Sequence, residues 1–216
     1  MEDISVYLGT LLTFVSNILA VLYVIGITKH GKAYRYFTGY LVLIAIIQTI
    51  MHVYAQNEMN NIFLFQYYFI GQFIFLSLFY KVLIQKKWIL WIMIMVLTVL
   101  GIQYVVNPGA FSSYHTIGVS VTQSIIVIYA VIYYYLSLSG RNLFLLINTG
   151  ILLYFMTSIL YFASGNLIIS LDLPKGTQRY INLGNQVLYG IFLVFVFIEW
   201  YRHYRIKIRT VEERSN

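Results

Sequence analysis

Polar side chains recur at helical spacing inside several long apolar stretches of this chain. Residues three or four positions apart share one face of an α-helix, so sets with that spacing form polar stripes. The sets are Thr10, Thr13 and Asn17; Gln48, His52 and Gln56; Gln66 and Gln72, which lie six positions apart; Thr116, Ser120, Gln123 and Ser124; and Asn182, Asn185, Gln186 and Tyr189. Amides, hydroxyls and one imidazole suit a small neutral ligand that is held by hydrogen bonds.

Members of these stripes are predicted to line a ligand pocket: Asn17, Gln48, His52, Gln72, Gln123, Asn182, Asn185 and Gln186. His52 is the strongest single candidate, because it lies well inside an apolar stretch and its charge can change near neutral pH. The alternative is structural, because the same residue types join membrane helices through hydrogen bonds of about 0.6 kcal/mol each. Both interpretations stay open at this level.

The chain lacks the groups that most membrane enzymes require. It contains no cysteine, hence no thiol nucleophile, disulfide or thiolate metal site. Among its acidic residues none pairs with His52 at helical spacing, and the stretch 180–201 has no lysine for a retinal Schiff base. We therefore predict a non-enzymatic protein with no catalytic residue, no metal ligand and no cofactor.

The elements that carry the polar stripes are predicted to be transmembrane helices. Hydrophobic residues make up 60% of the chain and charged residues 10%. The apolar stretches run over 5–27, 37–56, 62–84, 88–106, 115–136, 143–164 and 180–201, and about 20 apolar residues suffice to cross a bilayer. The prediction is an all-α integral membrane bundle of seven helices, residues 1–201, followed by a basic tail, residues 202–216.

The basic residues predict the orientation of the bundle. With the N-terminus outside and the C-terminus in the cytoplasm, all lysines and arginines except Lys175 and Arg179 fall on the inner side, as the positive-inside rule requires. The net charge of +7 then faces anionic lipid headgroups, and no direct nucleic-acid binding is expected. In this orientation most of the polar stripes lie in the outer half. Glu199 lies near the inner side, and its spacing of three from Arg202 allows an ion pair on one helical face.

An internal repeat is a further hypothesis. A shift of 106 positions places Ser16 and Asn17 on Thr122 and Gln123, and Tyr23 on Tyr129. The first and last three helices would then be parallel copies joined by the fourth helix, a 3+1+3 plan that occurs in small transporters. The Pro-Gln pair of PQ-loop and SWEET transporters is absent, since the only prolines are Pro108 and Pro174.

The run from Asn60 to Phe73, continued by Leu76–Tyr80, resembles a group of uncharacterised seven-helix inner-membrane proteins of Bacteroidetes-type bacteria. The stretch from Asn182 to Trp200 is compatible with the same group, and together these segments cover about a third of the chain. The resemblance implies a multi-pass protein of a bacterial inner membrane. It carries over no catalytic residue.

Three functions remain as hypotheses. The first is a seven-helix receptor or sensor that takes a small neutral polar ligand from the outer side and signals to a separate cytoplasmic partner through the basic tail. The second is a small-solute facilitator of PQ-loop or SWEET-like plan. The third is an oligomeric accessory subunit in the membrane, for example of a phage-defence or CRISPR system.

Overall fold

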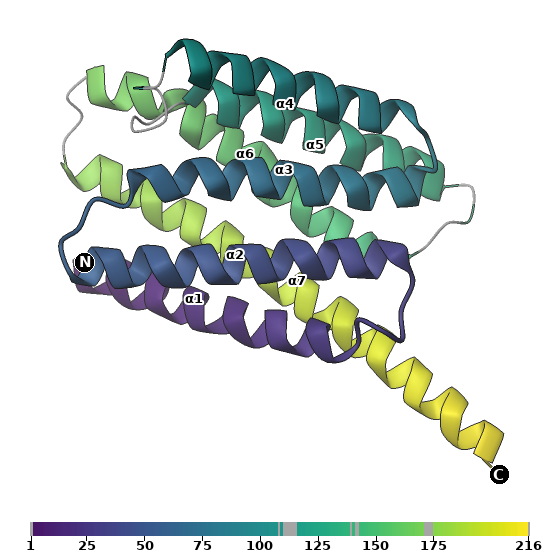
Figure 1. Cartoon of the computed structure of the whole chain (residues 1–216). Helices are drawn as coiled ribbons and strands as arrows, with labels where there is room; N and C mark the ends of the chain where they lie inside the picture. Colours follow the sequence, from purple (N-terminus) through teal and green to yellow (C-terminus); the bar gives the residue numbers. More distant parts are fainter. Residues whose placement is uncertain are drawn as a thin grey trace.

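The structure is a computed structural model that describes the backbone of residues 2–107, 109, 116–138, 140, 143–170 and 175–215. Side chains are described over the same ranges except at 2, 3, 116, 162–170, 175–179, 181, 182 and 203–215. These residues form seven helices and no strand (Figure 1). The helices are α1 (Glu2–Ile25), α2 (Lys32–Gln56), α3 (Ile62–Ile84), α4 (Trp88–Val106), α5 (Thr116–Ser137), α6 (Leu145–Ser170) and α7 (Lys175–Ser215).

Most helix bounds agree with the apolar pattern. Helices α3 and α4 coincide with the predicted ranges 62–84 and 88–106. Helix α2 begins at Lys32 rather than at 37, because its first turn is polar and aromatic and carries no continuous apolar signal. Helix α7 does not end near 201 but continues to Ser215, so the backbone of the basic tail extends the last helix.

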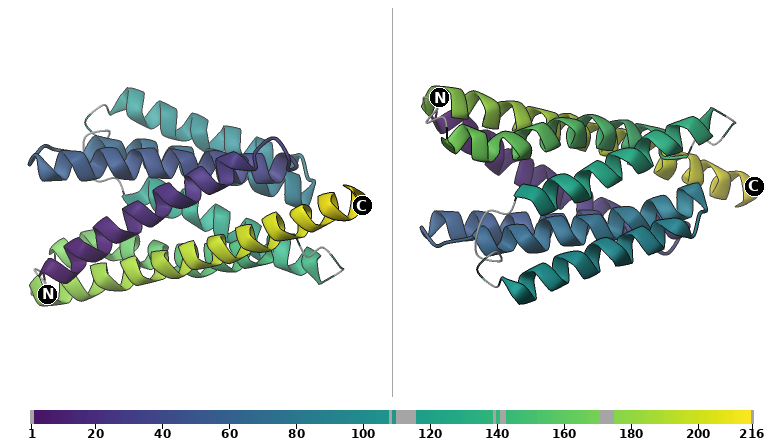
Figure 2. Two further views of the ribbon diagram at one scale, coloured as in Figure 1. Left: turned by 90° about the horizontal axis from the view of Figure 1, so that it is seen from below. Right: turned by 90° about the horizontal axis from the view of Figure 1, so that it is seen from above.

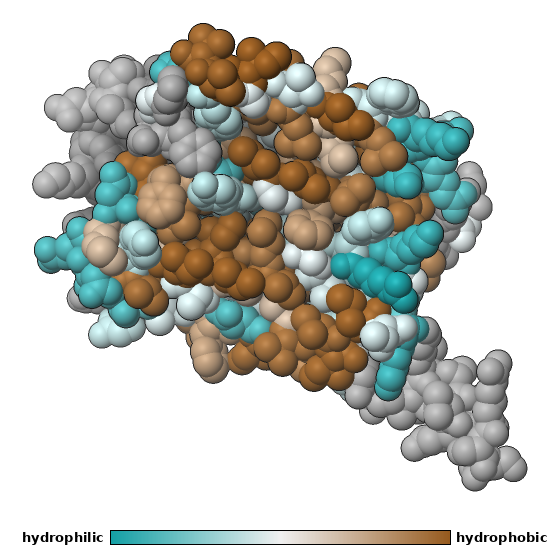
Figure 3. All heavy atoms as spheres, in the orientation of Figure 1, coloured by the Kyte–Doolittle hydropathy of each residue, from teal (hydrophilic) through white to brown (hydrophobic). Residues whose placement is uncertain are grey.

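The apolar helices are those of a multi-pass membrane protein. In the described part of the chain, six segments are long and apolar enough to cross a membrane: Ile4–Ile25, Lys32–Gln56, Ile62–Ile84, Trp88–Val106, Ile117–Ser137 and Leu183–Arg202. In α6 the described side chains form a shorter apolar segment, Leu145–Tyr161. Figure 3 shows a hydrophobic belt across one face, with hydrophilic residues gathered toward both ends.

Six of the helices form a closed ring. Each helix of the series α1, α2, α3, α5, α6 and α7 packs against the next, and α7 packs back against α1. Within the described residues α4 packs principally against α3, on the outside of the ring. Figure 2 shows α1 and α7 close together at their N-terminal ends and separating toward their C-terminal ends. The first and last helices of the chain therefore close the ring.

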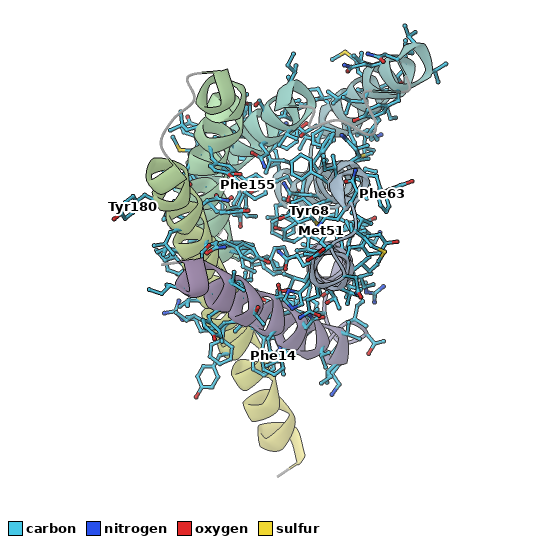
Figure 4. The ribbon with its side chains drawn as sticks, turned by 90° about the vertical axis from the view of Figure 1, so that its left-hand side faces the viewer. Phe14, Met51, Phe63, Tyr68, Phe155 and Tyr180 are labelled. Atoms are coloured by element: carbon cyan, nitrogen blue, oxygen red, sulfur yellow. The ribbon has the colours of Figure 1, made fainter. Side chains whose placement is uncertain are left out.

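The interior of the ring is filled largely by aromatic side chains. Tyr40, Phe79 and Tyr80 are fully buried, and the ring centroids of Phe79 and Tyr80 lie 5.2 Å apart. Figure 4 looks onto the end of the bundle that holds the N-terminus; there Tyr68 and Phe155 lie toward the middle, whereas Tyr180 points outward. Large aromatic side chains bury much area and prefer edge-to-face or offset contacts, so this core holds the six helices in one arrangement.

Candidate functional site

A cleft lies between α1, α2 and α7 near the end of the bundle that holds the N-terminus. We call it the α1–α2–α7 cleft; its volume is about 430 Å³. Its lining residues come from all three helices: Ser5, Val6, Gly9, Thr10, Leu12 and Thr13 of α1; Gln48, Met51 and His52 of α2; and Gln186 and Tyr189 of α7. Hydroxyl, amide and imidazole groups thus converge on one space from three separate segments.

Gln48 joins the three helices at this cleft. Its Oε1 atom accepts a hydrogen bond of 2.9 Å from the Ser16 hydroxyl of α1 and one of 3.2 Å from the Tyr189 hydroxyl of α7. Ser16 and Tyr189 are both buried. Because two buried donors hold the carbonyl oxygen, the amide group of Gln48 has a defined orientation.

The walls of the cleft carry further hydrogen-bonding groups. Ser5 donates to Oε1 of Gln186 at 3.3 Å, and Nε2 of Gln56 lies 3.0 Å from Nε2 of His52. Within the described residues, the amide nitrogens of Gln48 and Gln186 have no hydrogen-bond partner in the protein. Both can donate to a ligand, so the cleft is suited to a neutral molecule with acceptor oxygens.

The predicted pocket residues separate into two groups in the structure. Gln48, His52 and Gln186 line the cleft together. Asn17 does not; its side-chain nitrogen donates to the Thr13 carbonyl oxygen at 2.8 Å and contacts the Thr49 hydroxyl at 3.0 Å, which joins α1 to α2. Hydrogen bonds of this kind between helices are what the structural alternative predicts.

The other predicted residues do not line the cleft: two are buried, one is half-buried, and the side chain of one lies outside the described residues. Gln72 and Gln123 are each 2% exposed, and the Oε1 atom of each has no partner among the described residues. Asn185 is half-buried, and its Oδ1 atom likewise has no hydrogen-bond partner among the described residues. The side chain of Asn182 lies outside the described residues.

Polar atoms without a described partner are spread through the ring. They are Oη of Tyr40, Oε1 of Gln72, Oγ of Ser77, Oε1 of Gln123, Oη of Tyr129, Oγ of Ser158 and Oδ1 of Asn185. They belong to five of the six ring helices. Buried polar atoms are costly unless water or a ligand satisfies them, so each of these positions is a place where water or a ligand could bind.

Glu199 links α7 to the start of α6 at the opposite end of the bundle. Its side chain is buried, and its two oxygens accept hydrogen bonds from the backbone nitrogens of Phe144 at 3.1 Å and Leu146 at 3.3 Å. These amides precede or open α6, which begins at Leu145. A carboxylate is favourable there because it accepts from unpaired amides at the positive end of the helix dipole. The sequence spacing between Glu199 and Arg202 did not predict these hydrogen bonds to the start of α6.

Two further residues of the site were missed at the sequence level. Ser16, next to Asn17, donates to the Gln48 carbonyl oxygen, and Tyr189 donates to the same oxygen and lines the cleft. The signal for Tyr189 in the sequence was its place in the same polar stripe as Gln186.

The chain matches no protein-family model, no curated protein and no solved structure. The interpretation of the site therefore depends on its own geometry.

Proposed function

We propose that this chain is a non-enzymatic receptor or sensor of a bacterial inner membrane that binds a small neutral polar ligand in the α1–α2–α7 cleft. In the proposed orientation the N-terminus is outside, so the cleft opens in the outer half of the bundle. The observation that carries the proposal is the position of Gln48, whose carbonyl oxygen is held from α1 and α7 while its amide nitrogen stays available.

The chemistry of the cleft favours a neutral ligand. Among the side chains that the structure describes, the lining of the cleft includes no acidic or permanently basic group, and its titratable groups are His52 and Tyr189. The donors are amide nitrogens and an imidazole, which bind carbonyl, ether or hydroxyl oxygens. Pockets for small molecules combine an apolar lining with a few such polar groups, and Val6, Leu12 and Met51 supply the apolar part here.

Helix α7 provides a physical connection from this cleft to the cytoplasmic side. It contributes Gln186 and Tyr189 to the cleft and, further along, Glu199 to the start of α6. It then projects beyond the other helices (Figure 1). A ligand that repositions Tyr189 would therefore act on the same rigid element that carries the basic tail, where a separate cytoplasmic partner would bind. Such a ligand shifts the balance between two arrangements only by binding one of them more tightly.

Purified protein tests the binding proposal. A library of neutral, hydrogen-bonding small molecules is screened by thermal unfolding against the wild type, Gln48→Leu and Gln103→Leu. The control makes the same substitution on α4, outside the ring. We expect at least one class of compound to stabilise the wild type and Gln103→Leu but not Gln48→Leu. Binding that is equal in all three proteins, or no binding in any, would contradict the proposal.

A facilitator of small solutes is the second candidate, and the order of the ring favours it. The contact of α1 with α7 has its counterpart in the contact of α5 with α3, and the pairs α1–α2 and α2–α3 correspond to α5–α6 and α6–α7. This order is compatible with two parallel three-helix copies joined by α4. Solute flux into proteoliposomes distinguishes the candidates, since a receptor binds its ligand without moving it.

A further inference from the structure

A second hollow lies between α1 and α7, directly beyond the α1–α2–α7 cleft. We call it the α1–α7 groove; its volume is about 490 Å³ and every lining residue is apolar. Leu12, Leu19 and Leu193 are buried in its floor. Ile18, Val194 and Phe197 line it too, and each is 44–54% exposed, so the groove opens on the outer surface of the ring.

The groove has a clear physical origin. Where the cleft meets the groove, α1 and α7 are close to each other. A Cβ atom added to Gly190 would lie only 3.3 Å from the side chain of Leu12. The helices then separate (Figure 2). Further along, long aromatic side chains bridge them: the Tyr23 hydroxyl donates to the Val196 carbonyl oxygen at 2.9 Å, and the Trp200 indole donates to the Leu22 carbonyl oxygen at 3.1 Å. Between these two zones the aliphatic side chains are too short to fill the space.

The cleft and the groove are continuous. Leu12 lines both of them. On α1 the polar lining extends to Thr13 and the apolar lining to Leu19; on α7 the polar lining ends at Tyr189 and the apolar lining begins at Gly190. Polar and apolar surfaces therefore follow one another along the same pair of helices, from the N-terminal end toward the middle of the hydrophobic belt.

We propose that the ligand is an amphiphile with one alkyl chain, whose neutral headgroup occupies the cleft while the chain lies in the groove. The inference rests on the proposed function, because the headgroup uses the same cleft. A membrane lipid of that leaflet has the same orientation, with its polar end at the interface and its chain toward the midplane. The stretch from Leu11 to Leu19 measures about 12 Å along the helix axis, which accommodates an extended chain of about ten carbons.

Selectivity would come from both parts of the site. An alkyl chain moving from lipid into the groove gains little from the hydrophobic effect, because lipid tails are as apolar as the groove. The fit of the chain and the hydrogen bonds of the headgroup to Gln48 and Gln186 must therefore supply the affinity. Binding affinity should therefore increase with the length of the alkyl chain only until the chain fills the groove.

Photolabelling tests the inference. The protein is reconstituted in lipid nanodiscs with monoacylglycerols of 6 to 16 carbons that carry a terminal diazirine, and the labelled residues are mapped by mass spectrometry. The variants are Val194→Trp in the groove, Gln48→Leu in the cleft, and Val131→Trp on α5 as a matched control. Val194 and Val131 are 54% and 52% exposed, so both substitutions place an indole on a lipid-facing helix surface. Gel filtration and thermal unfolding verify that each variant is folded.

We expect labelling on the α1 and α7 residues of the groove, increasing with chain length up to about ten carbons. Val194→Trp and Gln48→Leu should each lower the labelling of the groove residues about tenfold, equivalent to ~1.4 kcal/mol. Val131→Trp should leave this labelling unchanged. Labelling that is lost in Val194→Trp but unchanged in Gln48→Leu would overturn the joint site, as would labelling spread evenly over the lipid-facing surface. If chainless polar compounds bind in a Gln48-dependent manner and Val194→Trp has no effect on labelling, the amphiphile inference fails while the proposed receptor stands.

Discussion

The hydroxyl of Tyr189 on α7 donates a hydrogen bond of 3.2 Å to Oε1 of Gln48 on α2. This bond connects two helices that are not neighbours around the ring, since α1 lies between them. The same oxygen accepts from Ser16 of α1, so one amide ties together the three helices that build the cleft. The ring is thereby closed by polar contacts at the place where a ligand would bind.

Removing the Tyr189 hydroxyl should weaken this closure without emptying the core. Tyr189→Phe keeps the aromatic ring and loses one interhelical hydrogen bond, which costs about 0.6 kcal/mol in a membrane bundle. We expect a small decrease in the midpoint of thermal unfolding and a larger loss of ligand stabilisation, because the Gln48 carbonyl oxygen keeps only the hydrogen bond from Ser16 and its amide group is less firmly oriented. Tyr7→Phe, at an exposed position of α1, is the control. An unchanged ligand response in Tyr189→Phe would count against the cleft.

Glu199 should contribute more to stability than its position near the end of a membrane helix suggests. Glu199→Gln replaces one of two acceptor oxygens by a donor that faces a backbone amide, and leaving a buried amide unsatisfied costs about 1–3 kcal/mol. We expect lower stability and faster hydrogen exchange at the amides of Phe144 and Leu146. Glu58→Gln makes the same change at an exposed loop position and should have no effect. Equal behaviour of the two variants would refute the capping role.

A substitution at Gly71 should disturb the contact between α2 and α3. A Cβ atom there would lie 2.3 Å from Cδ2 of Leu43, whereas a Cβ atom on Gly101 of α4 meets nothing within 4 Å. Gly71→Val should therefore be less stable than Gly101→Val by roughly 1–3 kcal/mol, the usual cost of overpacking. Both changes carry the same helix-propensity effect, so the difference in unfolding free energy isolates the packing. No difference would mean that Leu43 moves aside without cost.

The orientation of the bundle can be tested by cysteine labelling, because the wild-type chain contains no cysteine. Glu58→Cys lies in the turn between α2 and α3, and Lys86→Cys in the turn between α3 and α4; both positions are exposed. A membrane-impermeant maleimide should modify Glu58→Cys in intact cells and Lys86→Cys only after permeabilisation. The reverse pattern would place the cleft on the cytoplasmic side and exclude an external ligand.

The sequence alone predicted seven apolar helices, and six segments in the described part of the chain are long and apolar enough to cross a membrane. Bilayer thickness sets a length of about 20 apolar residues, and this length made the bounds of α3 and α4 predictable to the residue. The amides Gln48 and Gln186 were also found from their helical spacing, and the structure brings them to one cleft. The polar start of α2 at Lys32 carried no such signal.

Only the tertiary structure decided which helices meet. Hydropathy does not indicate which apolar helices are neighbours. The local sequence therefore could not predict that Asn17 joins α1 to α2 whereas the adjacent Ser16 donates to Gln48. Spacing paired Glu199 with Arg202, but the carboxylate reaches the backbone of Phe144, 55 residues earlier. The groove between α1 and α7 depends on how two distant helices diverge, and such a separation is a property of packed side chains rather than of either segment.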